Sequence, residues 1–115
     1  MKKLFILSIV FLLFIITSCS SGSEDNNMNP PPNNNVTYAG NIKAIIDGAC
    51  LNCHVDPPIN GAPMPLITLA NVQEAVQNRD LIGRVENGSM PPAGNDLTAA
   101  QVQAIKDWQS GGFKP

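Results

Sequence analysis

Apolar residues recur at helical spacing in the second half of the chain. The first helical segment begins near Val36 and runs into Cys50. Its apolar positions are separated by three, four and seven residues, and they are Ile42, Ile45, Ile46 and Ala49. This spacing places the four side chains on one face of a helix, which can then pack against a core.

Two short helices are predicted after it. Asn71 and Glu74 have a spacing similar to a capping box, which predicts that the second helix starts at Asn71. Asp80 is a favourable N-cap for a third helix, and Asn87-Gly88 would end it. The expected buried positions of these two helices are Val72, Ala75, Val76, Leu81, Ile82 and Val85.

The last predicted helix has the clearest ends. Thr98 and Gln101 form a capping-box pattern, and the pair Gly111-Gly112 would stop the helix. Its apolar positions are Val102, Ile105 and Trp108. Proline-rich loops at residues 56–65 and 90–95 separate the helices, and no segment alternates as a strand does. The sequence therefore predicts an all-α domain.

The first residues have the layout of a secretory signal. A basic start precedes an uncharged apolar run at residues 4–16, which is short for a bilayer span of roughly 20 residues. The next residues, Ile16-Thr17-Ser18-Cys19, resemble a bacterial lipobox. This resemblance implies that residues 1–18 are a lipoprotein signal peptide and that Cys19 is acylated. An uncleaved membrane anchor is the alternative.

A linker is expected between this leader and the helical domain. Residues 19–35 are rich in Ser, Asn and Pro, and they have no apolar periodicity that could form a core. We therefore divide the chain into a signal peptide, a lipid-anchored flexible linker and a domain at residues 36–115. The protein is expected in the cell envelope, lipid-anchored to the membrane. Ser20 and the acidic residues after it resemble lipoproteins of the outer membrane, facing the periplasm or the surface.

Composition restricts the function further. The formal net charge is −2, and it becomes −4 without Lys2 and Lys3 of the leader, which excludes a basic nucleic-acid-binding protein.

After the leader the aromatic residues are only Tyr38, Trp108 and Phe113. Because so small a domain is marginally stable alone, a metal, a disulfide or a cofactor is expected to complete its core.

The chemistry of the chain centres on Cys50-Leu51-Asn52-Cys53-His54. This C-x-x-C-H pattern is typical of a covalent attachment site for c-type haem. Two thiols three positions apart on a helical turn face the same way and can add to two vinyl groups at one porphyrin edge. His54 would then direct an imidazole nitrogen at the iron. Attachment needs an oxidising compartment outside the cytoplasm, in agreement with the leader.

Three other interpretations of the motif fit the sequence less well. A structural zinc site needs four ligands, but besides Cys19 the chain offers only Cys50, Cys53 and His54. A thioredoxin-like redox pair would require a βαβ context, which the sequence does not predict. A Cys50–Cys53 disulfide would leave the aromatic-poor core unexplained.

From about Tyr38 to Gly112 the chain resembles small monohaem c-type cytochromes of the His/Met type. The resemblance rests on C-x-x-C-H and on the later stretch Asn87-Gly88-Ser89-Met90-Pro91-Pro92. It implies a helical domain wrapped around one covalently attached haem c. It also implies that Met90 is the distal axial ligand, opposite His54. The two prolines restrict the loop that presents the thioether.

Met64 is the rival candidate for this ligand, only ten residues after His54. The resemblance instead places its segment on the side of His54, where a carbonyl of Pro63 or Pro65 would accept the bond from His54 Nδ1. Trp108 is expected in the core, with a bond from its indole to a haem propionate as the alternative. Arg84 and Tyr38 are further candidates for propionate contacts.

The function expected from these features is that of a membrane-tethered electron carrier. It would pass electrons between a donor and an acceptor protein as a monomer, and it would not be an enzyme, because no acid–base pair, nucleophile or phosphate loop accompanies the motif. One alternative is a haem-based gas-binding or sensor module, in which a gas displaces Met90. The other is an electron-delivering subunit of a larger oxidoreductase.

The lipobox resemblance predicts that Cys19 anchors the protein. Replacement Cys19→Ser should move the protein to the soluble fraction or leave it unprocessed, as measured by membrane fractionation and by the mass of the mature chain. A Cys19→Ser variant that is processed and membrane-bound like the original would contradict lipidation at this residue.

Overall fold

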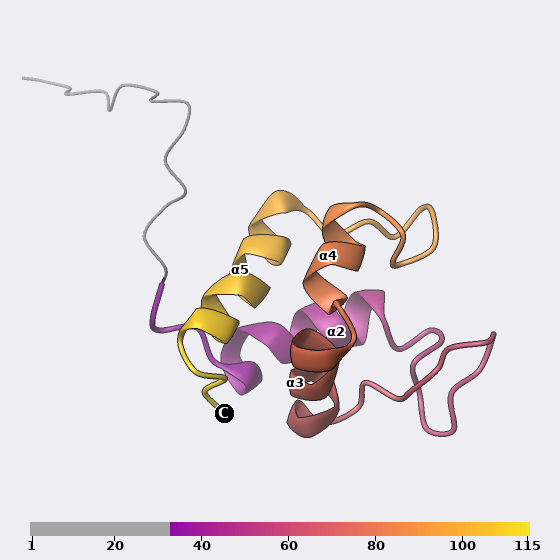
Figure 1. Cartoon of the computed structure of the whole chain (residues 1–115), viewed down its shortest axis with the longest axis horizontal. Helices are drawn as coiled ribbons and strands as arrows, with labels where there is room; N and C mark the ends of the chain where they lie inside the picture. Colours follow the sequence, from indigo (N-terminus) through magenta and orange to yellow (C-terminus); the bar gives the residue numbers. More distant parts are fainter. Residues whose placement is uncertain (1–32) are drawn as a thin grey trace, which may run out of the picture.

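The computed structural model describes residues 33–115. The predicted signal peptide at 1–18, Cys19 and the predicted linker up to residue 32 lie outside the described residues. Residues 33–115 form helices joined by loops, with no strand among them, which confirms the all-α prediction for this part of the chain (Figure 1).

The chain enters the domain through one π-helical turn, η1 (Tyr38–Ile42), that continues into α2 (Lys43–Ala49). The Thr37 hydroxyl accepts a 3.0 Å hydrogen bond from Gly40 N and caps this turn. A Cβ at Gly40 would lie 2.9 Å from that hydroxyl oxygen, so the cap needs glycine there. Ile42 and Ile46 are buried on the face that the sequence predicts.

Helix α3 (Leu69–Asn78) begins two residues before the predicted start at Asn71. Its N-cap is Thr68, whose hydroxyl accepts from Asn71 N at 3.2 Å while Thr68 N donates to the Asn71 side chain at 3.2 Å. The Asn71 amide thus replaces the usual Glu or Gln of a capping box, so the box begins at Thr68 and the predicted start at Asn71 is wrong. The predicted buried stripe of Val72, Ala75 and Val76 is confirmed.

Helix α4 (Leu81–Glu86) follows α3 after only two residues. Asp80 stands at the predicted N-cap position, but it has left-handed backbone angles (φ 55°) and its side chain makes no capping bond, so the predicted capping interaction is wrong. Its carboxylate lies against Gly83 instead, where a Cβ would come within 2.4 Å of Oδ1. The helix ends at Asn87 and Gly88 as predicted, with Gly88 at φ 72°.

Helix α5 (Ala99–Ser110) has the predicted ends. The Thr98 hydroxyl accepts from Gln101 N at 3.2 Å, and Thr98 N donates to the Gln101 side chain at 2.8 Å. Gly111 forms the C-cap, and Gly112 has a positive φ of 84°. Ile105 and Trp108 point into the core, and neither is exposed to solvent.

Trp108 organises the aromatic part of the core. Its ring lies 5.8 Å from that of Tyr38, centroid to centroid, and 4.8 Å edge-to-face from that of Phe113. This confirms that Trp108 lies in the core, where it packs the last helix against η1. The indole N–H donates to the Lys114 carbonyl oxygen at 2.7 Å. The only hydrogen-bond donor of the indole is therefore used inside the core.

The same C-terminal residues hold the start of the domain. Tyr38 N donates to the Lys114 carbonyl at 2.8 Å, and Lys114 Nζ donates to the Asn34 carbonyl at 2.6 Å. Figure 1 shows the beginning of the described chain next to the C-terminus as a result. Val36, just after this contact, is the first buried residue of the described part.

Within residues 33–115, none of the helices combines the length and the apolar character required to traverse a bilayer.

The α5 cap provides a test of the fold. Thr98→Ala removes the hydroxyl that accepts from Gln101 N, and should lower the free energy of unfolding by about 1 kcal/mol. That loss corresponds to a fall in Tm of about 4–8 °C for a domain of this size, measured by thermal denaturation. Thr98→Ser keeps the hydroxyl and is the matched control. An alanine variant as stable as the serine variant would contradict the role of this cap.

Candidate functional site

One cavity of about 840 Å³ lies between the turn after α2, the loop at 55–65, the α3–α4 junction and the loop after α4. Cys50, Cys53, His54 and Met90 all line it, so the structure brings the predicted residues of the domain together. Cys19 lies outside the described residues. The apolar part of the lining consists mainly of Ala49, Ala62, Pro63, Met64, Leu66, Ala75, Leu81, Val85, Pro91 and Pro92.

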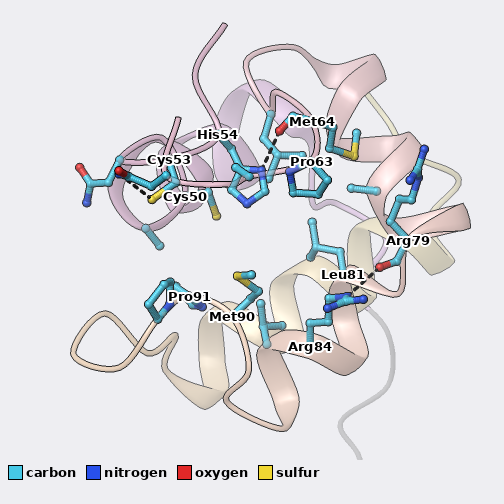
Figure 2. Close-up of a pocket in the computed structure, with 18 of the residues that line it drawn as sticks. Cys50, Cys53, His54, Pro63, Met64, Arg79, Leu81, Arg84, Met90 and Pro91 are labelled. Carbon is cyan, nitrogen blue, oxygen red and sulfur yellow. Dashed lines mark hydrogen bonds between the residues drawn. The ribbon is translucent and has the colours of Figure 1, made fainter. Parts of the chain in front are cut away.

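A tight turn at the end of α2 presents the motif. Cys50 is the C-cap of α2, and its carbonyl accepts from Cys53 N at 3.2 Å and from His54 N at 3.0 Å. The chain thus makes one further turn after α2. As a result both thiols lie at one edge of the cavity, and His54 lies beside them (Figure 2).

The two thiols are free, so the structure contains no Cys50–Cys53 disulfide. Burial raises the pKa of the Cys50 thiol to about 11 from its usual 9.0, because the thiolate would lose hydration. Cys53 Sγ accepts a 3.6 Å contact from the Asn60 side chain. Cys50 is therefore neutral at physiological pH and lies against the apolar wall.

His54 is held by two bonds from the loop that follows it. Its Nδ1 lies 2.7 Å from the Met64 carbonyl oxygen, and its own carbonyl accepts from Leu66 N at 2.8 Å. Since a carbonyl can only accept, Nδ1 carries a proton, and in the neutral ring Nε2 has the lone pair. The prediction that Pro63 or Pro65 supplies this carbonyl is wrong by one residue, because the loop closes with Met64 as the nearest peptide.

Met90 lies on the opposite wall from His54. Gly88 turns the chain after α4, and Met90 N donates to the Arg84 carbonyl at 3.1 Å. Figure 2 shows the Met90 thioether pointing across the cavity toward the His54 ring, whereas Met64 lies on the same side as His54. The thioether of Met90, and not that of Met64, is thus opposite the imidazole.

Two of the candidates for propionate contacts are placed elsewhere. Tyr38 and Trp108 belong to the core cluster and do not line the cavity, and the indole N–H of Trp108 is already bonded to Lys114. Trp108 thus lies in the core as expected, and the structure gives no support to a propionate contact from either residue. Arg84 does line the cavity.

Sequence reasoning missed three groups of this site: the Arg79 side chain, the Asn60 side chain and the Met64 carbonyl. Arg79 ends α3 and lines the cavity beside Arg84. A signal for it existed, because these two residues are the only arginines of the chain and stand five positions apart. A backbone carbonyl such as that of Met64 leaves no such signal, since every residue has one.

The other interpretations of the motif gain no support. In the part of the chain that the structure describes, no three His, Cys, Asp or Glu side chains are grouped as metal ligands, and no βαβ unit surrounds the cysteines. The chain matches no family model, no curated protein and no solved structure.

Proposed function

We propose that this protein is a single-haem c-type cytochrome that carries electrons. Haem would be bound covalently through Cys50 and Cys53, with His54 and Met90 as axial ligands of the iron. The observation that carries this proposal is the cavity in which an imidazole and a thioether face each other while two free thiols occupy one edge.

The residues present fit such a group. The cavity volume of about 840 Å³ lies within the range of roughly 300–1,000 Å³ usual for cofactor sites. Its lining is largely apolar, as a flat porphyrin face requires. The bond from His54 Nδ1 to a carbonyl leaves Nε2 as the nitrogen able to bind a metal.

The chemistry that the bound haem supplies is one-electron exchange between ferrous and ferric iron. His54 is oriented by the Met64 carbonyl, which also increases the basicity of its free nitrogen. Met90 offers a neutral, soft thioether that favours the ferrous state and raises the reduction potential. Leu66 and Leu81 are buried and line the cavity, so they would keep water away from the bound iron.

We further propose that the domain acts at a membrane as an electron carrier without substrate turnover of its own, tethered through a lipid on Cys19. Its donor and acceptor would be redox proteins of the cell envelope. The acidic character of the chain favours partners with basic faces and makes the association sensitive to salt.

The covalent link can be tested on the denatured protein. Extraction with acidified organic solvent should leave the pigment on the polypeptide, because thioether bonds survive unfolding. The double variant Cys50→Ala/Cys53→Ala should lose all covalently bound haem, as measured by absorption and by mass. Pigment that leaves the wild-type chain, or that stays covalently bound to the double variant, would contradict the proposal.

The ligand assignment can be tested by comparing the two methionines of the cavity. Met90→Ala should abolish the sulfur-to-iron absorption band and lower the potential by on the order of 0.1 V, within the roughly 0.8 V that axial ligands span. Met64→Ala is the matched control, because it keeps the backbone carbonyl that holds His54. If Met64→Ala loses the band and Met90→Ala keeps it, Met64 is the ligand.

Carbon monoxide binding to the wild-type protein would favour a gas sensor.

A further inference from the structure

Both arginines of the chain line the cavity, and none of the lysines in the described part of the chain does. Figure 2 shows Arg79 and Arg84 at the end of the cavity away from Cys50 and Cys53. In a chain of formal net charge −2, this gathers two permanent positive charges at one end of a largely apolar cavity, which the Asp80 carboxylate also lines. Such an arrangement suits a ligand that has an anionic edge.

Arg84 lies in α4 and is bonded to residues before and after this helix. Its Nε donates to the Arg79 carbonyl at 3.2 Å, and its own carbonyl accepts from Met90 N at 3.1 Å and from the Ser89 hydroxyl at 3.3 Å. Among residues 33–115 the two terminal nitrogens of Arg84 have no hydrogen-bond partner. Its guanidinium is thus oriented by one bond and keeps its terminal donors for a ligand.

Arg79 is also available to a ligand. Its nearest acidic partner is Glu74, with 3.8 Å between Nε and Oε1, and both side chains are about half exposed, so this pair contributes little. Glu74 in addition accepts a 2.6 Å bond from the Asn78 side chain. The carboxylate that lines this part of the cavity, Asp80, lies against Gly83 and forms no ion pair with either arginine.

We infer that Arg79 and Arg84 bind the two propionate carboxylates of the haem, an inference that rests on the proposed function. A porphyrin with two vinyl groups on one edge has its two carboxylates on the opposite edge. The cysteines and the arginines lie at opposite ends of the cavity in the same way. A guanidinium matches a carboxylate with two parallel N–H donors, which offsets the cost of burying the charge.

This arrangement also influences the potential. Positive charge near the iron disfavours its ferric form, which carries one more positive charge than the ferrous form. Coulomb's law for a charge about 10 Å away, at an effective dielectric constant of about 20, gives a change on the order of tenfold in the ferrous-to-ferric ratio at a fixed applied potential. Both arginine side chains are exposed, and solvent screens their interaction with the iron, so we expect a shift of roughly threefold to tenfold.

The test uses the full chain with haem attached, purified as the variants Arg84→Gln and Arg79→Gln. At the midpoint potential of the wild-type protein, the ferrous-to-ferric ratio should fall roughly threefold to tenfold in each variant. Arg84→Lys keeps the charge and should restore most of the ratio. Lys43→Gln removes an equal charge from the exposed face of α2, outside the cavity, and should leave the ratio unchanged.

Redox-difference infrared spectra give the second measurement. The carboxylate bands of the haem should shift in Arg84→Gln and Arg79→Gln, but not in Lys43→Gln. If both glutamine variants retain the sulfur-to-iron band, the wild-type ratio and the wild-type carboxylate bands, the inference is wrong. Should Arg84→Gln not accumulate with haem, Arg79→Gln decides, because its side chain makes no hydrogen bond to the backbone. A wild-type chain without covalent haem would instead reject the proposed function.

Discussion

The hydrogen bond between His54 Nδ1 and the Met64 carbonyl is the interaction on which the candidate site depends. With the bond from Leu66 N to the His54 carbonyl, it folds the loop at 55–65 back over the motif. Two bonds at one residue hold both its backbone and its ring, so the loop needs no regular structure of its own. The free nitrogen then points into the cavity, and this determines what the cavity can bind.

The opposite wall is built on a short junction. Helices α3 and α4 are separated by Arg79 and Asp80 alone, and Arg84 joins this junction to the Met90 loop through its side chain and its carbonyl. One residue therefore connects the position of the thioether to the proposed anionic edge of the ligand. A change in one part of this wall is expected to affect the other.

The aromatic core lies apart from the cavity. Trp108, Tyr38 and Phe113 pack together where Lys114 holds both ends of the domain, and none of them lines the cavity. Leu66, Ala75 and Leu81 are buried and also form part of the cavity wall. The core can thus hold the helices together, while the apolar side chains that line the cavity stay available to a large flat cofactor. This division suits a domain with few aromatic side chains.

The sequence by itself determined the local features. Helical spacing predicted most of the buried residues, although Ile82 and Val85 are only partly buried. The pair Thr98 and Gln101 predicted the start of α5, and the C-x-x-C-H motif identified one edge of the site, because each depends on residues a few positions apart. Contacts between distant residues were decided only by the tertiary structure. These include the Lys114 carbonyl on Tyr38 N and the Asn34 carbonyl on Lys114 Nζ, and the Met64 carbonyl on His54 is also selected by the path of a loop. Backbone carbonyls are the same in every residue, so only the path of the folded chain selects which one a side chain meets.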